Sequence, residues 1–102
     1  MYAVIFRSTR TLNQADLYQE WSQRMEASVQ QVNGYLSHVG FRDPRTRQGV
    51  TISYFESEEA ITRWREMAEH LTAQQLGREH FYEDYHIEVA HIERSYGWYR
   101  DN

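Results

Sequence analysis

The chain has 102 residues, a formal net charge of −4 and a hydrophobic content of 40%. This length leaves room for one domain without a second core, and the apolar content excludes a disordered chain. The negative charge argues against binding of nucleic acid through its phosphates, and the lack of cysteine removes disulfides and thiolate chemistry.

The apolar run at the N-terminus, Tyr2 to Phe6, is followed at once by Arg7. It is too short for the apolar core of a signal peptide or for a membrane span. We therefore expect a cytoplasmic protein that does not enter a membrane.

The first half of the chain predicts a strand, a helix and a second strand. Residues 2–8 are rich in β-branched and aromatic side chains, which favours a strand. Asn13 is expected to cap a helix that ends at Gly34, because glycine adopts the left-handed conformation without a Cβ penalty. The apolar stripe of this helix comprises Leu17, Trp21, Met25, Val29 and Val32. Residues 35–42 predict the second strand, which Pro44 closes.

The second half predicts a strand, a helix and a strand. A polar hairpin at 45–49 leads into a strand at 50–55. Ser57 is expected to cap the next helix, whose pattern continues, with a break in it, as far as Phe81. The apolar stripe of this helix includes Ala60, Ile61, Trp64, Met67, Ala68 and Leu71. Residues 85–94 alternate in hydrophobicity and predict the last strand.

The predicted order, β-α-β-β-α-β, is that of a ferredoxin-like α+β domain. We assign it to residues 1–95, and residues 96–102 to an aromatic tail that is too apolar to remain in water. Helices on one face of a four-stranded sheet leave the other face bare, and its expected side chains are apolar. A second copy packed sheet to sheet would cover that face, so we expect a homodimer.

The end of the third strand and the start of the second helix resemble the antibiotic biosynthesis monooxygenase family. In that family an aromatic residue, a glutamate and a serine end the strand, and an alanine and a tryptophan follow on the helix. The matching residues here are Phe55, Glu56, Ser57, Ala60 and Trp64. The Gly34-Tyr35 pair and the 93–96 segment also fit, so the resemblance runs along nearly the whole chain.

The resemblance implies a dimeric α/β barrel with one pocket per protomer, between the sheet and its helices. Members of the family include oxygenases that oxidise aromatic polyketides or quinols without metal or flavin, and haem-degrading enzymes. A deprotonated phenol can give an electron to O₂ by itself, so the protein needs only an aromatic pocket, a base and a cation or dipole. We therefore expect a cofactor-independent monooxygenase acting with O₂ on a small aromatic or quinol-like substrate, with no metal site.

Two residues are expected to be catalytic. His70 lies close to the position of a tyrosine in the polyketide-oxidising branch, which implies a proton relay, although a surface or capping histidine explains it as well. Arg7, at the end of the first strand, is expected to stabilise a phenolate unless it reaches solvent instead.

Four residues are expected to contact substrate: Trp64, Tyr54, His38 and Met67. Trp64 is explained equally well as a core residue of the second helix. His38 shares one face of its strand with Arg42, so pairing across the sheet is as good an explanation as catalysis.

Three further functions fit the same sequence. The first is haem degradation, but a haem-degrading enzyme of this family would carry a histidine where the chain has Gln74 and an asparagine close to where it has Arg7. His70 would then have to bind iron in a different register. The second is a dimer that binds a small ligand, such as haem, without turnover. The third is a structural dimer whose own aromatic side chains fill the pocket.

Overall fold

Three elements form each half of the domain. The computed structural model describes residues 1–75 and 81–101, with all of their side chains except those of 71–75. In chain order the elements are β1 (Tyr2–Arg10), α1 (Ala15–Val29), β2 (Tyr35–Arg42), β3 (Gln48–Phe55), α2 (Glu58–Gln75) and β4 (Tyr82–His91). The predicted ferredoxin-like order is confirmed, while the expected helical pattern at 76–80 lies outside the described residues.

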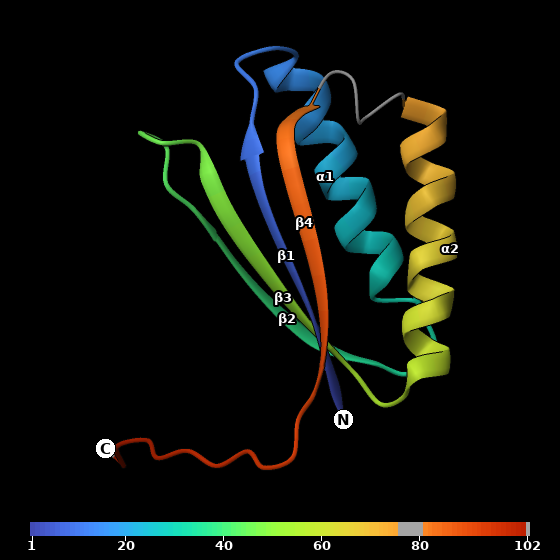
Figure 1. The fold of residues 1–102 in the computed structure, drawn as a ribbon, viewed down its shortest axis with the longest axis vertical. Helices are drawn as coiled ribbons and strands as arrows, with labels where there is room; N and C mark the ends of the chain where they lie inside the picture. The colour runs from blue at the N-terminus through green and yellow to red at the C-terminus, as the bar shows by residue number, and fades with distance from the viewer. Residues whose placement is uncertain (76–80, 102) are drawn as a thin grey trace.

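The strands form one antiparallel sheet in the order β2-β3-β1-β4. Both helices lie on the same face of this sheet and run side by side (Figure 1). Neither of the described helices is long and apolar enough to cross a membrane.

Strand pairing assigns each side chain to one face of the sheet. Val4 pairs with Ser53 of β3 and Val89 of β4, and Val4 and Ser53 face the helices. Because side chains alternate along a strand, Ile5 and its partner Ile52 point to the opposite, outer face. One face of the sheet therefore packs against the helices, and the other is left uncovered within one chain.

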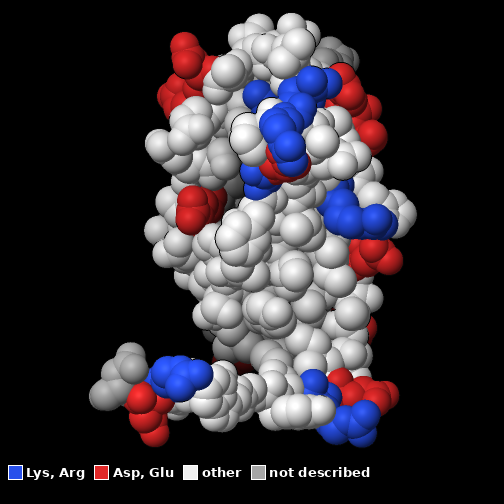
Figure 2. Space-filling view, turned by 90° about the vertical axis from the view of Figure 1, so that its left-hand side faces the viewer, with Lys and Arg blue, Asp and Glu red and all other residues white. Residues whose placement is uncertain are grey.

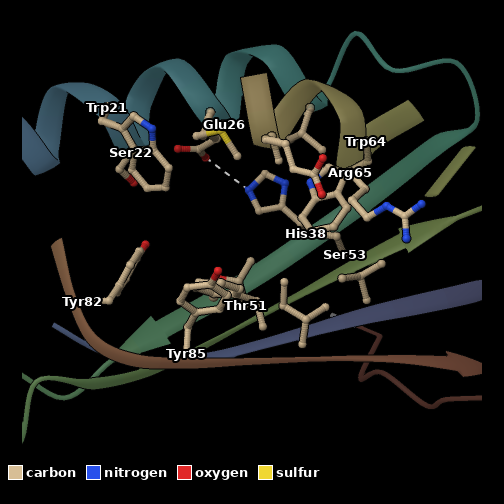
Figure 3. Close-up of a pocket in the computed structure, with 18 of the residues that line it drawn as sticks. Trp21, Ser22, Glu26, His38, Thr51, Ser53, Trp64, Arg65, Tyr82 and Tyr85 are labelled. Atoms are coloured by element: carbon tan, nitrogen blue, oxygen red, sulfur yellow. Dashed lines mark hydrogen bonds and ion pairs between the residues drawn. The ribbon is translucent and has the colours of Figure 1, made fainter. Parts of the chain in front are cut away.

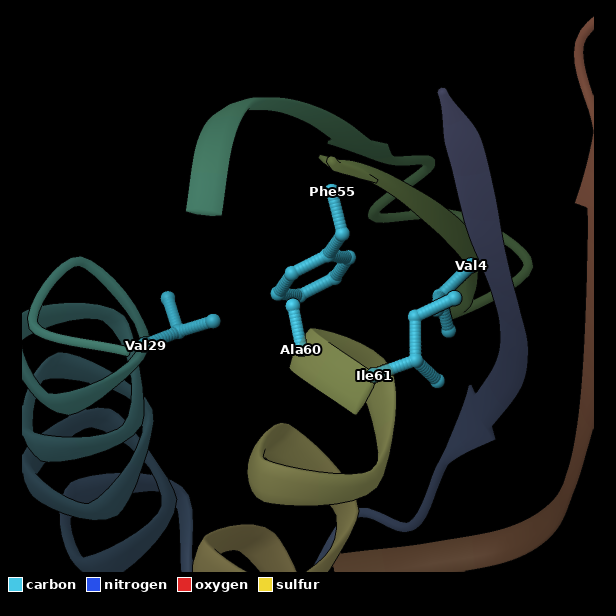
Figure 4. Close-up of a cluster of buried hydrophobic side chains, with 5 residues drawn as sticks. All are labelled: Val4, Val29, Phe55, Ala60 and Ile61. Carbon is cyan, nitrogen blue, oxygen red and sulfur yellow. The ribbon is translucent and has the colours of Figure 1, made fainter. Parts of the chain in front are cut away.

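The core lies where the beginning of α2 meets α1 and the sheet. Figure 4 shows its five buried side chains converging from four elements, and they are Val4, Val29, Phe55, Ala60 and Ile61. Phe55 and Ala60 are fully buried. Trp64 and Met67, one and two turns further along α2, pack against this cluster and are half-buried.

Several predicted element ends differ from those observed. The residue that caps α1 is Gln14, in the left-handed conformation and without a side-chain cap bond, rather than Asn13. The helix ends at Val29, and Gly34 with φ 98° instead ends the turn that leads into β2. The cap of α2 is confirmed, because the Ala60 amide donates to Ser57 Oγ at 3.2 Å. β4 begins at Tyr82, three residues earlier than expected.

The tail after β4 remains exposed within one chain. Tyr96 is 93% exposed, Trp98 77% and Tyr99 84%. The tail runs away from the helices, on the outer side of the sheet (Figure 1). Figure 2 looks onto that side, where charged side chains gather toward one end and the rims and leave a broad uncharged area.

Candidate active site

A cavity of about 460 Å³ separates the sheet from the two helices. Figure 3 shows α1 and α2 above it and the strands below. Aromatic side chains make up much of its wall, namely Phe6, Tyr18, Trp21, Trp64, Tyr82 and Tyr85. An open cavity beside Trp64 does not fit a structural dimer in which the protein's own side chains fill the pocket.

A chain of hydrogen bonds borders this pocket at His38. The Tyr35 hydroxyl lies 2.6 Å from His38 Nδ1, and His38 Nε2 lies 3.2 Å from a carboxylate oxygen of Glu26. Figure 3 shows the imidazole reaching from the sheet toward Glu26 on α1. Both ring nitrogens are therefore held, and the ring is fixed at the pocket wall between a phenol and a carboxylate.

This arrangement suits both charge states of the imidazole. Burial, and then the charge of Glu26, raise the pKa of Tyr35, so its hydroxyl stays protonated. With neutral His38, the Tyr35 hydroxyl donates to Nδ1 and Nε2–H donates to Glu26. With protonated His38, Nδ1–H donates to the Tyr35 oxygen while the bond to Glu26 remains. Gain of a proton by His38 thus requires only that the Tyr35 hydroxyl turn.

The other end of the pocket provides hydrogen-bond donors rather than a base. Burial is the main cause that raises the pKa of Tyr82 far above its ordinary value, and the neighbouring Tyr18 adds to it. The hydroxyl of Tyr82 therefore remains protonated at physiological pH. Arg42 also lines this pocket and bears a permanent positive charge.

The structure brings two of the predicted site residues to the pocket. Trp64 and His38 both line it. Met67 packs against the core cluster and is not among the lining residues. Tyr54 pairs with Ala3, so it faces the outer side of the sheet.

The two residues expected to be catalytic lie elsewhere. Arg7 projects from the outer face, where it forms an ion pair with Glu88 at 3.1 Å. His70 is an exposed residue of α2 that is not among the residues lining the pocket. Their catalytic roles therefore remain predictions.

Two residues of the site, Glu26 and Tyr35, did not emerge from the sequence as functional candidates, whereas Arg42 was noted only as sharing a strand face with His38. Glu26 directly follows Met25 of the apolar stripe, and that neighbouring position was its only signal. Tyr35 and His38 are three residues apart, which puts side chains on opposite faces of a regular strand. A register irregularity between Tyr35 and Ser37 removes this conflict.

Of the two positions that bear on haem degradation, Arg7 lies on the outer face of the sheet, and the side chain of Gln74 lies outside the described residues. Among the described side chains, no group of three or more His, Asp or Glu is placed to hold a metal ion.

Comparison with known proteins first gives relatives by sequence. An uncharacterised protein of Bacillus subtilis, YqjZ, is 38% identical over 93 residues, which are 91% of this chain and 80% of the relative. A jasmonate monooxygenase of Pyricularia oryzae is 29% identical over 97 residues. That match covers 93% of this chain but only 45% of the longer relative.

Solved structures share the fold at lower identity. SnoaB, a cofactor-independent oxygenase from Streptomyces nogalater, superimposes with a TM-score of 0.72 at 16% identity, covering 92% of this chain and 94% of its own. PA3566 from Pseudomonas aeruginosa gives a TM-score of 0.71 at 16% identity, covering 91% and 94%. The family model of antibiotic biosynthesis monooxygenases matches residues 1–76, from β1 through α2. With this match over about three quarters of its length, the chain belongs to the antibiotic biosynthesis monooxygenase family.

Proposed function

We propose that this protein is a cofactor-independent monooxygenase that uses O₂ to oxidise a small aromatic or quinol-like substrate in the pocket between sheet and helices. The observation that carries the proposal is the Glu26–His38–Tyr35 chain at the wall of an aromatic cavity. It supplies a proton acceptor next to a surface on which a flat ring can stack.

The chemistry needs one proton acceptor and a sheltered ring. A substrate O–H gives its proton to the Glu26–His38 pair and leaves a phenolate or enolate. This anion transfers one electron to O₂, and the two radicals combine to form a carbon–oxygen bond. The Glu26–His38 pair returns its proton to the resulting peroxide anion. Loss of water from this hydroperoxide leaves a carbonyl, so one CH₂ group and one O₂ become one C=O and one H₂O. The electrons come from the substrate, and the protein handles the proton and excludes solvent.

The geometry favours His38 over His70 as the proton acceptor. His38 lines the pocket with its side chain only 20% exposed, and a partner holds each of its nitrogens. Trp64 forms the wall beside it, as the family resemblance implies. The relatives described as a jasmonate monooxygenase and as a cofactor-independent oxygenase support oxygenation as the reaction class.

A homodimer formed through the outer face completes the proposal. This face exposes Phe41 at 74% and Val39 at 42%, next to half-buried Ile52. The Arg7–Glu88 pair lies on the same face and already balances its own charge. A second copy would bury these side chains and cover the aromatic tail, which extends on that side of the sheet (Figure 1).

Oxygen uptake tests the reaction. Purified protein, free of flavin and treated with a metal chelator, is mixed with a panel of quinols and anthrones in an oxygen electrode. We expect saturable uptake that exceeds the uncatalysed autoxidation and yields the carbonyl product. Uptake that appears only when metal or flavin is restored would contradict the cofactor-independent reaction, and uptake with no member of the panel would argue against these substrates.

A further inference from the structure

A second charged group of the pocket, Arg42, has no part in the proton transfer described above. Its guanidinium donates from Nη1 to the Arg47 carbonyl at 2.7 Å and to the Ser8 carbonyl at 3.2 Å. It also donates from Nη2 to Ser8 Oγ at 2.7 Å. These three bonds hold the group in place but use only neutral acceptors, and a guanidinium has five N–H donors.

The backbone is shaped around this guanidinium. A Cβ atom on Gly49 would lie 2.7 Å from Arg42 Cζ, so any side chain there would push the guanidinium out of this position. Ser8, which accepts two of its bonds, is 4% exposed. Arg42 is therefore fixed before any ligand arrives, which reduces the entropy lost on binding.

A second cation reinforces the positive charge at this end. Arg10 is 7% exposed, and its guanidinium lies 3.7 Å from the centre of the Tyr18 ring. It donates to the carbonyl oxygen of Phe81. Among the ion pairs of the described residues, none includes Arg10 or Arg42. Two neighbouring cations without a carboxylate partner make this end of the pocket favourable for an anion.

The pocket also has carboxylates, which lie on its helical side. Glu26 is engaged by His38, and Glu69 belongs to α2. Arg42 and His38 lie four residues apart on the helix-facing side of β2, which corresponds to about 13 Å along a strand. The positive end and the proton acceptor thus lie at different places along the pocket, which lets one ligand contact both.

We propose that Arg42 is a specificity-determining residue that receives an anionic oxygen of the substrate, so that the substrate is an acid with an apolar ring body. The inference rests on the proposed function and narrows its substrate class. The carboxylate or other anionic group lies at Arg42, near the Tyr18 and Tyr82 hydroxyls. The apolar body fills the aromatic pocket, and the oxidisable position lies at the His38 end.

Paired ligands test this assignment. 2-Naphthoate and 2-naphthamide share one apolar body and differ in charge, and calorimetric titration gives their dissociation constants without any turnover. Wild-type protein should bind the acid about 10- to 100-fold more tightly, as expected for charge-assisted hydrogen bonds. Arg42→Gln should reduce this ratio to about 1, with little change for the amide, and the retained affinity for the amide shows that the pocket is intact.

Arg45→Gln serves as the matched control. Arg45 is a hairpin cation with 88% of its side chain exposed, and it does not line the pocket. The acid-to-amide ratio should stay at the wild-type value in this variant. A similar fall in both arginine variants would show that overall charge governs the preference, which would overturn the role of Arg42.

The remaining outcomes are separable. Equal wild-type affinity for the two ligands would overturn the anion site while leaving an aromatic pocket, whereas binding of neither would overturn the proposed function together with the inference. A ratio kept in Arg42→Gln would also overturn the role of Arg42. If that variant does not fold, Arg42→Lys retains the charge without the two-armed geometry. A several-fold fall in the ratio would then support the proposal, and an unchanged ratio would contradict it.

Discussion

The His38 side chain is the residue on which the proposed chemistry depends most directly. Its two nitrogens have partners of opposite character, a phenol that stays protonated and a carboxylate. A general base positioned in this way contributes roughly 10²–10⁴-fold to a rate. Its effect on turnover can be separated from its effect on packing, because His38 is not part of the buried core cluster.

Replacing His38 with alanine should therefore lower turnover by roughly 10²–10⁴-fold with little change in stability. Steady-state oxygen uptake measures the rate, and chemical denaturation measures the free energy of unfolding. His70→Ala is the informative comparison, since the family resemblance implied that His70 relays the proton. A large loss in His70→Ala with a normal rate in His38→Ala would exchange the two roles.

Gly34 shows how one residue determines the approach of two elements. Its φ is 98°, and a Cβ atom placed there would lie 2.6 Å from the Cβ of Ala60. Gly34→Ala should lower the free energy of unfolding by about 2–4 kcal/mol, which combines backbone strain with overpacking. Denaturant titration checks this value. Gly97→Ala adds a methyl group to open space and should change stability by less than about 0.5 kcal/mol.

At the scale of single residues, the sequence predicted best the places of side chains that belong to a strong local pattern. Trp64 followed from the apolar stripe and the family resemblance, and it lines the pocket. Arg7 was expected either to stabilise a phenolate in the pocket or to reach solvent, and strand pairing places it on the outer face beside Glu88. One position of register reverses the face of a strand residue, and composition alone does not reveal register. Tyr35 was not identified as a site residue for the same reason, since an irregularity in β2 brings it to His38.

Among the elements, α2 carries Trp64, and the residues around its first turn stabilise its N-terminus. Ser57 Oγ accepts a hydrogen bond from the Ala60 amide at 3.2 Å, and Glu58 and Glu59 follow in the first turn. A serine at this position satisfies an amide that the helix leaves unpaired, and the acidic residues favour the helix dipole.

Ser57→Ala should therefore destabilise the protein by about 0.5–2 kcal/mol. Ser57→Asp retains a capping oxygen and should preserve most of that stability, as the midpoint of urea unfolding would show. Thr62→Ala, at an exposed site in the same helix, serves as the control. Equal stability of wild type and Ser57→Ala would mean that packing of Ala60 and Ile61 alone positions the helix.

Capping chemistry predicted the start of α2 well, but it failed for α1. Asn13 has the preferred side chain for a cap, yet Gln14 takes that place with φ 57°. The backbone of Asn13 is engaged differently: its N–H donates to Thr11 Oγ1, and its carbonyl oxygen accepts from Arg10. The early start of β4 has a similar origin. Tyr82 pairs with Arg10 across a register shift, a contact between segments far apart in the sequence.

For the whole molecule, the unequal faces of the sheet are the observation behind the proposed homodimer. The helices cover one face, and the other exposes apolar side chains over a broad uncharged area (Figure 2). The sequence predicted this asymmetry from the alternation of β1 alone. A domain of about 100 residues buries only roughly 60–65% of its unfolded surface, so a partner also adds stability.

A charge placed in the outer face should break the proposed homodimer. Phe41→Glu introduces a carboxylate at a side chain that is 74% exposed in one chain, and burying it in an interface would cost far more than exposing it in the monomer. Sedimentation velocity should show a dimer for wild type and a monomer for this variant. Leu12→Glu changes an 80% exposed side chain in the loop before α1 and should leave the dimer intact. If Phe41→Glu sedimented as a dimer, as the wild type and Leu12→Glu should, the copies would have to meet through another surface. If the wild type sedimented as a monomer, the outer face and the aromatic tail would require a different partner.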